Sequence, residues 1–591
     1  MASIKELELM ANKLRVHSLV ATTEAGSGHP SSCLSSAEIM SCLFFSVLGK
    51  NDEFILSKGH AAPILWAAFA EAGFFSREKL KNLRKINSFL EGHPTARMPY
   101  IKVATGSLGQ GLSAGVGMAL AKKLKQENGK IFVLLGDGEC AEGSVWEAAS
   151  VAAFYRLENI VAVIDVNGFG QSGQTMHAHN LENYRNKFEA FGWQTVLVNG
   201  HKVSELLSAF KKAKKSQQPF VIIAKTFKGK GVSILENKEG WHGKTLKKEY
   251  LAQAIEEIGP IEIKLTSSFK ISKKTDTKFH DFSFNNYKLG DMISTREAYG
   301  KALVNLGKAN KKVVVIDSDV NNSTMTEYFF KKFPKRSFQS FIAEQNMVGM
   351  AIGFSAMGFS PFVATFSCFL TRAHDFIRMA QYSLANIKFV GSHAGVSIGE
   401  DGPSQMGLED IPMFLNIPGA LVLYPSDAVS TEYLVKEMAK FKGISYLRTT
   451  RGKTPVIYKN GEKFPVGKFK VWGKSEKDKV LIVASGITLH EALKAQKILK
   501  KRGVSIRVID FYSLQPVDRY ALIKEAKECR NNVIVVEDHY YSAIGFVVSA
   551  ILGKVKILCV REMPRSGKPE ELLKKYSIDS EAIIKEVSEY L

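Results

Sequence analysis

The 591-residue sequence lacks several patterns that would mark special classes of protein. There is no C-x-x-C pair, so spacing suggests neither a zinc site nor a disulfide framework. There is no run of about eighteen apolar residues that could cross a membrane, and no short repeat or low-complexity tract. The six cysteines are Cys33, Cys42, Cys140, Cys368, Cys529 and Cys559. We therefore expect a folded cytoplasmic protein with reduced thiols and no membrane contact.

The N-terminal stretch also lacks the features of a targeting peptide. Charges interrupt its apolar residues, which excludes the apolar core of a secretion signal, and Glu6 and Glu8 are acidic where a transit peptide avoids acid. Apolar residues make up 45% of the chain and charged residues 23%, which is typical of globular proteins. The net charge of +22 would attract phosphate-bearing partners, without choosing among metabolites, nucleic acid and lipid headgroups.

Short β-branched apolar runs alternate with longer helical patterns, which predicts an α/β fold with parallel sheets. Strands buried on both faces read as continuous Val/Ile/Leu runs, and several of these runs end in Gly, Asp or His. Such folds place ligands at the carboxyl ends of the strands. The predicted strands are 131–138, 159–168, 219–227, 312–319, 387–395, 480–486, 505–514 and 532–539.

Two changes in composition divide the chain into three consecutive α/β domains. A stretch rich in Lys, Ser and Asn before Asp291 has no clear period, and a second stretch with Gly and Lys turns runs from 453 to 480. The predicted domains are 1–260, 291–455 and 456–591, with a linker at 261–290.

The sharpest local motif is Gly136-Asp137-Gly138 at the end of one predicted strand, followed by Asn167 at the end of the next. Adjacent strand ends would bring Asp137 and Asn167 together, and their oxygens suit Mg²⁺, which prefers octahedral oxygen ligands completed by phosphate, water or a carbonyl. The flanking glycines would let a diphosphate approach the backbone. A tight turn without a ligand is the alternative interpretation.

Other motifs in the same domain are compatible with a site for a phosphorylated ligand. The run from Gly106 to Gly111 precedes a helical pattern of small residues, so its amides could face phosphate oxygens or simply permit helix packing. Four histidines, His29, His60, His93 and His242, lie beside Gly or Pro in segments with turn character. Any one of them could be structural, but a group of imidazoles could bind sugar hydroxyls and move protons near neutral pH.

These motifs occur in an order that resembles the transketolase family of thiamine-diphosphate enzymes, most closely its animal-type branch. The resemblance covers essentially the whole chain. Its motifs are GSGHPSS, LSKGHAAPI, EGHPTA, ATGSLGQG, GDGECAEGSVWEA, DVNGFGQS, AKTFKGKG, KEGWHGK, STREAYGKAL, FIAEQNMVGMAIG, SHAGVSIGEDGPSQM, VEDHYY and PRSGKPEELL.

The resemblance implies two thiamine-diphosphate-binding-fold domains and a C-terminal transketolase-type domain. The first domain would bind the cofactor diphosphate and the second its aminopyrimidine, in a homodimer whose active sites lie at the interface, with Glu142 matching a carboxylate linked to that interface. The implied metal ligands are Asp137, Asn167 and the carbonyl of Phe169, for Mg²⁺ with Ca²⁺ or Mn²⁺ as substitutes. The implied cofactor-binding residues are Ser32, His60, Gly106, Ser107, Leu108, Gly138, Asn167, Lys228, His242, Glu344, Phe366, Phe369 and Gln405.

Glu344 matches the carboxyl group that protonates the pyrimidine ring and so promotes loss of the thiazolium proton. Without the resemblance, Glu344 would be interpreted as a helix cap or an exposed acid. Phe366 and Phe369 would be interpreted as residues of the apolar core. The implied substrate-binding residues are His29, His93, His242, Arg296, Ser323, His393, Asp401 and Arg451, and the four histidines among them would also be catalytic. Arg372 lies where some members place a tyrosine near the pyrimidine.

The implied reaction is reversible transfer of a two-carbon ketol unit from a ketose phosphate such as xylulose 5-phosphate. The acceptor would be an aldose phosphate such as ribose 5-phosphate or erythrose 4-phosphate, as in the non-oxidative pentose phosphate pathway. The alternatives are a 1-deoxyxylulose-5-phosphate synthase, a transketolase-like protein without turnover, and a basic nucleic-acid-binding protein. The last is disfavoured because no nucleic-acid motif is present.

Overall fold

The computed structural model describes residues 2–271 and 278–591, which form two compact units. The described residues of the first unit are 2–271, 348–358 and 382–384, and those of the second are 278–347, 359–381 and 385–591. Residues 272–277 of the predicted linker lie outside the described residues. The described parts of that linker contain no helix or strand.

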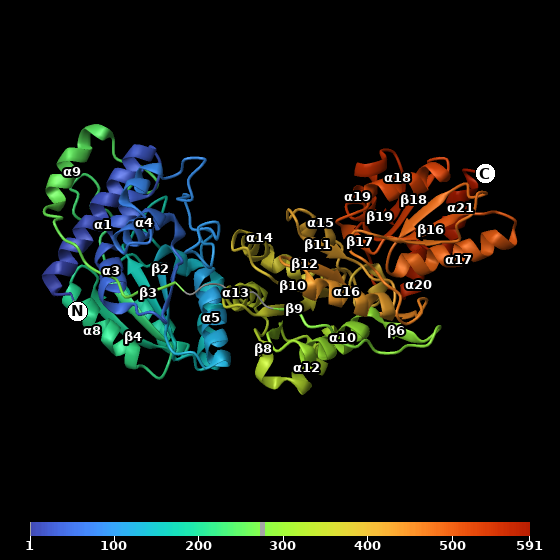
Figure 1. Ribbon diagram of the computed structural model, residues 1–591, viewed down its shortest axis with the longest axis horizontal. Helices are drawn as coiled ribbons and strands as arrows, with labels where there is room; N and C mark the ends of the chain where they lie inside the picture. Colours follow the sequence, from blue (N-terminus) through green and yellow to red (C-terminus); the bar gives the residue numbers. More distant parts are fainter. Residues whose placement is uncertain (1, 272–277) are drawn as a thin grey trace. The chain divides into compact units, whose positions relative to one another are not determined.

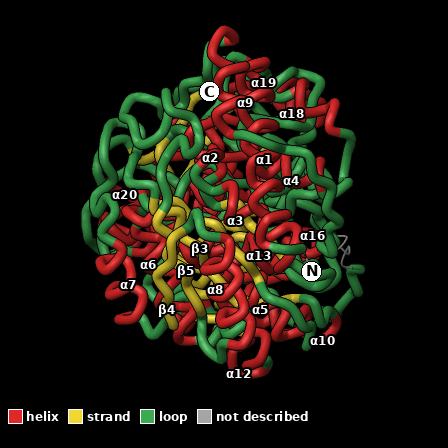
Figure 2. The backbone as a smooth tube through the Cα atoms, turned by 90° about the vertical axis from the view of Figure 1, so that its left-hand side faces the viewer, coloured by secondary structure: helices red, strands yellow, loops and turns green. Residues whose placement is uncertain are grey.

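The first unit is built on a parallel sheet of five strands in the order β1-β2-β3-β5-β4. Figure 2 shows β3, β5 and β4 side by side, with α8 (Val203–Lys215) across them. All residues of β2 and β3 are buried, which accounts for their continuous apolar sequences. The strands are β1 (Glu53–Leu56), β2 (Ile131–Gly136), β3 (Ile160–Val166), β4 (Gln194–Asn199) and β5 (Phe220–Lys225).

Helices cover both faces of this sheet (Figure 1). Alternate residues such as Phe132 and Val161 join one core with helices α1, α3, α4 and α8, while α5 packs on the opposite face, where Gly115 approaches Val133. The helices of this unit are α1 (Ile4–Ala25), α2 (Pro30–Leu34), α3 (Ala37–Cys42), α4 (Ala62–Glu71), α5 (Gly111–Lys125), α6 (Gly143–Phe154), α7 (Leu181–Ala190), α8 and α9 (Leu251–Ile258).

The second unit contains two larger sheets and a two-stranded ribbon of β6 (Met292–Ser294) and β13 (Lys453–Pro455). The first sheet has the order β17-β11-β12-β10-β9-β7-β8 and is parallel except for β17. Its strands are β7 (Val313–Asp317), β8 (Ser337–Gln339), β9 (Ser360–Phe366), β10 (Lys388–Ser392), β11 (Leu421–Leu423), β12 (Ser445–Arg448) and β17 (Ser513–Gln515).

The helices around this sheet include three that carry or support predicted site residues. Helix α10 (Thr295–Ala309) packs on α16 (Ala428–Lys440), and both contribute to one apolar core. Helix α13 (Glu344–Ala356) begins in the second unit and ends in the first. The shorter helices are α11 (Asn321–Thr324), α12 (Glu327–Lys332), α14 (His374–Tyr382) and α15 (Asp410–Leu415).

The second large sheet has the order β14-β16-β15-β18-β19 and its own apolar core. Its strands are β14 (Lys470–Trp472), β15 (Leu481–Ala484), β16 (Arg507–Asp510), β18 (Val533–Tyr540) and β19 (Lys556–Val560), of which only β14 is antiparallel to its neighbour. Its helices are α17 (Ile487–Lys501), α18 (Arg519–Glu528), α19 (Ile544–Leu552), α20 (Pro569–Lys575) and α21 (Ser580–Ser588).

The α/β class with parallel sheets is confirmed, and each predicted apolar run contains a strand. The run predicted as one strand at 505–514 was wrong in detail, because it divides into β16 and β17, which pair in different sheets. Phe511 and Tyr512 between them are buried on the way from one sheet to the other.

Candidate active site

One cluster of predicted site residues lies at the carboxyl edge of the first unit's sheet. Strands β2 and β3 are adjacent and parallel, with Gly136 opposite Asp165, so the turns that follow them meet. The Asp137 carboxylate accepts hydrogen bonds of 2.8 Å from the Gly168 amide and from the Thr175 hydroxyl. Burial raises the pKa of Asp137 to about 6. The turn therefore presents a carboxylate next to the Asn167 turn, inside the protein.

Asn167 is hydrogen-bonded to Asp165, a buried acid that was not among the predicted site residues. The Asn167 Nδ2 donates to Asp165 at 3.3 Å, which leaves its Oδ1 for other partners, among them the Phe169 amide at 3.2 Å. Asp165 also accepts from Ser35, Thr226 and the ammonium of Lys58. Burial alone would raise the pKa of Asp165, but these partners hold it below its ordinary value.

A lysine occupies the neighbourhood of the third predicted metal ligand. The Lys228 Nζ donates to the carbonyls of Phe169 at 2.8 Å and Gly170 at 3.1 Å, and lies 2.7 Å from His242 Nδ1. Burial, and then repulsion from Lys58, lowers the pKa of Lys228 to about 8. The Phe169 carbonyl thus faces a cation in this structure.

The four predicted histidines of the first unit come together from four separate turns. The ring of His29 lies 5.3 Å from that of His60, 6.2 Å from that of His93 and 5.0 Å from that of His242. Burial lowers the pKa of His29 to about 4 and that of His242 to about 3, and it lowers the pKa values of His60 and His93 as well. The four imidazoles are therefore neutral at pH 7, able both to donate and to accept hydrogen bonds.

The turn that carries His29 is placed by the end of α1. Ser3 and Glu6 form a capping box at the start of this helix, and Gly26 ends it in the left-handed conformation with φ +60°. The chain then passes through Gly28, with φ +142°, into α2, where Ser32 is buried. The Oγ of Ser32 and the Nδ1 of His29 are buried and have no hydrogen-bond partner within the described residues.

Glycines let the backbone turns around the histidines touch. Gly106 has φ +126°, and a Cβ on it would lie 2.7 Å from the ring of His93. A Cβ on Gly59, beside His60, would lie 2.5 Å from the Gly106 amide nitrogen. Ser107 and Leu108 follow in the same loop, and α5 begins at Gly111, where the sequence predicted a helix start. Larger residues at 59 or 106 would force these turns apart.

A second buried acid joins the Gly106 loop to the Asp137 turn. Glu139 accepts hydrogen bonds from the Gly109 amide at 2.9 Å and the Gly136 amide at 3.1 Å, and from the Ser57 hydroxyl at 2.5 Å. Gly138 lies next to it, at the start of a short 3-10 helix. Like Asp165 and Lys58, Glu139 was missed by sequence reasoning, and the available signal was a charged residue next to an apolar strand end.

The second unit holds a separate cluster around Glu344, the first residue of α13. Glu344 is only 5% exposed, and its Oε2 lies 3.3 Å from the Nε of the exposed Arg372. Phe366, at the end of β9, stacks on Phe369 with ring centroids 5.1 Å apart and on His393 with centroids 3.8 Å apart. This stack is flat, since the ring planes differ by 5° and 9°. Gln405 joins through its carbonyl, which accepts from the Cys368 thiol at 3.3 Å.

Basic groups adjoin this stack in the second unit. Arg296, in the first turn of α10, donates to the Ser323 carbonyl at 2.8 Å. Arg451, beyond β12, donates to the Ile398 carbonyl and to the Asp401 carboxylate, both at 3.0 Å. Burial, reinforced by the charges of Arg296 and Arg451, lowers the pKa of His393 to about 3. The cluster combines two cations with a neutral imidazole, which suits an anionic ligand.

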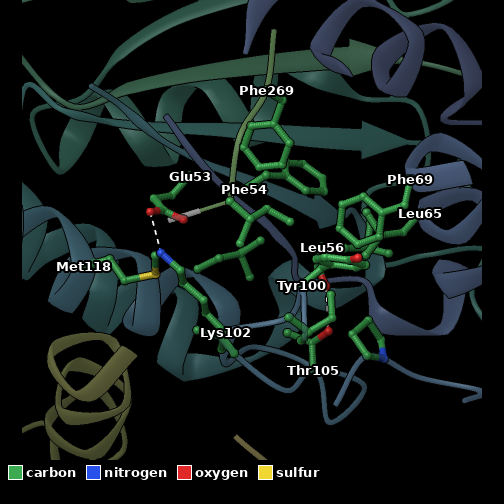
Figure 3. Close-up of a pocket in the computed structure, with 15 residues that line it drawn as sticks. Glu53, Phe54, Leu56, Leu65, Phe69, Tyr100, Lys102, Thr105, Met118 and Phe269 are labelled. Carbon is green, nitrogen blue, oxygen red and sulfur yellow. Dashed lines mark hydrogen bonds and ion pairs between the residues drawn. The ribbon is translucent and has the colours of Figure 1, made fainter. Parts of the chain in front are cut away.

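The small cavity in Figure 3 differs from these clusters because its lining is mostly apolar. It has a volume of about 20 Å³, room for about one water molecule. Apolar side chains such as Leu56, Phe69 and Phe269 line it, and the Lys102 ammonium donates to Glu53 at 2.6 Å beside it. It is too small for a sugar phosphate or a cofactor.

Comparisons with known proteins match the chain to three models of one family. Residues 7–313 match the family model described as transketolase, thiamine diphosphate binding domain. The transketolase pyrimidine binding domain matches 291–456, and the transketolase C-terminal domain matches 469–583. The chain belongs to the transketolase family.

The relatives of this transketolase-family chain include both transketolases and transketolase-like proteins. Human transketolase is 48% identical over 99% of this chain and 97% of its own length. Mouse transketolase-like protein 2 is 47% identical over the same shares of the two chains. The solved structure of transketolase from Campylobacter jejuni has a TM-score of 0.89 and 26% identity, and the match covers 100% of both chains.

Within residues 2–271 and 278–591, no group of three or more His, Cys, Asp or Glu side chains is arranged to hold a metal ion. Among the helices of the described residues, none has both the length and the apolar character needed to cross a membrane.

Proposed function

We propose that this chain transfers a two-carbon ketol unit from a ketose phosphate to an aldose phosphate, with thiamine diphosphate and Mg²⁺ bound. The observation that carries the proposal is the convergence of four histidine rings, with His93 against the Gly106 loop and His242 next to Lys228, which donates to the Phe169 carbonyl. These residues lie in the part of the chain that matches the thiamine diphosphate binding domain. Groups that bind hydroxyls therefore lie beside groups suited to a diphosphate.

The residues present fit the cofactor. The buried Ser32 Oγ and His29 Nδ1 have no partner among the described residues, so each can serve a ligand. The glycines at 59 and 106 let the turns of His60 and His93 pack directly on the Gly106 loop, because a Cβ at either position would clash with that packing. When bound, thiamine diphosphate supplies the carbon nucleophile and the electron sink for C–C bond cleavage.

The proposed metal ligands are the Asp137 carboxylate, the Asn167 amide oxygen and the Phe169 carbonyl. All three are hard oxygen donors of the kind that Mg²⁺ prefers, with Ca²⁺ or Mn²⁺ as substitutes. A bound ion would compete with Lys228 for the Phe169 carbonyl. The ion would anchor the diphosphate, because the reaction requires no redox step.

The two clusters would have different roles in proton transfer. Glu344, buried at the start of α13, would hold a proton against the pyrimidine ring, with Phe366 and Phe369 packed on that ring. His29, His93 and His242 would accept and return protons of the sugar hydroxyls, which requires the neutral imidazoles that burial provides.

The sugar phosphate would bind in the second unit. Arg296 and Arg451 would hold the phosphate with Ser323 and His393, and Asp401, which accepts from Arg451 at 3.0 Å, would orient that guanidinium and meet a sugar hydroxyl. The net charge of +22 would raise the local concentration of anionic substrates.

We propose that the active protein is a homodimer in which each site combines the first cluster of one chain with the second cluster of its partner. Large apolar side chains are exposed near both clusters, with Met176 73% exposed beside Thr175 and Ile342 78% exposed near Glu344. Burial of such side chains between two copies would stabilise a dimer. A cytoplasmic location is proposed because all six cysteines are free thiols.

Mixing two inactive variants tests the shared site. Asp137→Ala and Glu344→Gln lie in different clusters, so a mixed dimer has one site without a substitution only if each site draws on both chains. Random mixing should restore about a quarter of the wild-type activity, because half of the dimers are mixed and each has one intact site. No recovery in dimers shown to be mixed by mass spectrometry would contradict a shared site.

A coupled assay tests the function itself. Purified protein with thiamine diphosphate and Mg²⁺ should form sedoheptulose 7-phosphate from xylulose 5-phosphate and ribose 5-phosphate. Release of CO₂ from pyruvate in the presence of glyceraldehyde 3-phosphate, without sugar transfer, would instead indicate a 1-deoxyxylulose-5-phosphate synthase. No turnover with cofactor bound would indicate a transketolase-like protein that does not catalyse transfer.

A further inference from the structure

Arg84 lies between the turns that carry two of the clustered histidines. Its Nη1 donates to the hydroxyl of Ser27, two residues before His29. Its guanidinium also packs on Gly92, next to His93, since a Cβ on Gly92 would lie 2.9 to 3.0 Å from the Nε, Cζ and Nη2 of Arg84. One side chain therefore touches both turns.

The backbone of Arg84 is held in an uncommon conformation. Its φ is +61°, the left-handed region, and its amide donates to the Leu90 carbonyl at 2.9 Å, which closes the loop that leads to His93. Glycine or asparagine adopts this conformation at lower cost than arginine. The contacts of the guanidinium offset this cost and fix the direction in which the side chain leaves the loop.

The guanidinium also has an unused donor. The Nε of Arg84 is buried and has no hydrogen-bond partner in the part of the chain that the structure describes. Arg84, Gly92, His93 and Arg97 line a groove that is open to solvent, and the unpartnered Nδ1 of His29 belongs to a ring 6.2 Å from that of His93. Buried donors and acceptors without partners suit a ligand rich in hydroxyl groups, such as a sugar.

We propose that Arg84 is a positioning residue that holds the His29 turn and the His93 turn at a fixed separation. Its Nε–H would donate a hydrogen bond to an oxygen of the sugar substrate, directly or through a water molecule. The proposal rests on the proposed function and adds a residue to its substrate site. It predicts that Arg84 affects the use of the ketose more than the binding of the cofactor.

The charge of Arg84 gives an independent measurement of this arrangement. Burial is the main cause of the lowered pKa of His93, and the charge of Arg84 is the second cause. For His29, burial lowers the pKa most, followed by His93 and then by Arg84. The other groups of the first unit that face His29 are His60, His242 and Lys228. Arg97, also at the groove, is paired with Glu91 at 2.8 Å. Loss of the Arg84 charge should therefore raise both histidine pKa values.

The test compares Arg84→Met with Lys81→Met, which removes an exposed positive charge from the same segment. Arg84→Met should lower kcat/KM for xylulose 5-phosphate by about 10- to 100-fold, since misplaced catalytic groups cost up to about that factor. Lys81→Met should stay within about twofold of the wild type. Affinity for thiamine diphosphate, measured by calorimetry, should change less than kcat/KM in both variants.

Two further measurements separate this proposal from its assumptions. NMR titration of the histidine rings, assigned with His29→Gln and His93→Gln, should give higher pKa values in Arg84→Met whether or not the protein turns over. If Arg84→Met does not fold, Ser27→Ala removes only the bridge to the His29 turn and should lower kcat/KM about three- to tenfold. Unchanged kcat/KM and unchanged histidine titrations in a folded variant would overturn the proposal. Wild-type protein without sugar transfer would instead refute the proposed function.

Discussion

Replacement of Gly106 by alanine tests the packing of the cofactor loop against a substrate histidine. The new Cβ would lie 2.7 Å from the ring of His93, about 0.7 Å inside the 3.4 Å at which ordinary contact begins. The backbone would also be strained, because φ is +126° there, at a cost of about 1 to 3 kcal/mol. The His93 ring or the loop must therefore move by most of an ångström.

A displacement of this size has a measurable consequence. Since misplacement of a catalytic group by about 1 Å can cost about 100-fold in rate, we expect Gly106→Ala to lower kcat/KM for the ketose by about 10- to 100-fold. Calorimetric melting should show a lower Tm, and affinity for thiamine diphosphate should fall because the same loop carries Ser107 and Leu108.

Gly143→Ala is the matched control. Gly143 begins α6 in the same unit, and a Cβ there would meet nothing within 4 Å. Alanine should therefore leave kcat/KM unchanged and raise stability by about 0.5 to 1 kcal/mol. If Gly106→Ala keeps the kcat/KM and Tm of the wild type, the loop does not pack on His93 as described.

Three further predictions concern single carboxyl groups. Glu344→Gln should retain the far-UV circular dichroism spectrum and bind thiamine diphosphate but lose most turnover, and unchanged steady-state activity would refute the proposed proton transfer. Asp137→Ala should weaken cofactor binding in Mg²⁺ to the level that wild-type protein shows with a chelator, whereas a persistent chelator effect in the variant would place the metal elsewhere. Burial raises the pKa of Glu537 to about 8; the folded protein then keeps a proton that the unfolded chain releases near pH 4, so this group's contribution to the free energy of unfolding falls between about pH 4 and pH 8. Urea unfolding should thus show a flatter pH dependence for Glu537→Gln, and an equal slope would contradict this pKa.

Much of the fold followed from local sequence because the central strands are buried on both faces. Runs such as 131–136 and 160–166 are apolar throughout and could be located without knowledge of their neighbours. The short strands at sheet edges gave weaker signals. All three residues of β14 are only half-buried. The sequence predicted β17 as the end of one strand at 505–514, but β17 pairs with β11 in a different sheet. Pairing partners far away in sequence decide such elements.

The candidate site was predictable where a motif carries its own turn. Glycine or proline beside each histidine marked the turns, and Asp137 followed a strand end. The supporting charges were not predictable in this way. Lys58 and Asp165 are 107 positions apart, and Arg84 and Ser27 are 57 apart, so the sequence gives no local sign of either contact. A charged residue beside a buried strand is the most that the sequence offers.

The most direct test follows two labelled carbons through the reaction. With xylulose 5-phosphate labelled with ¹³C at C1 and C2 and unlabelled ribose 5-phosphate, NMR should find both labels, still bonded to each other, at C1 and C2 of sedoheptulose 7-phosphate. The remaining glyceraldehyde 3-phosphate should be unlabelled. Label that stays in the donor, or that reaches the product as a single carbon, would contradict the transfer of an intact two-carbon unit.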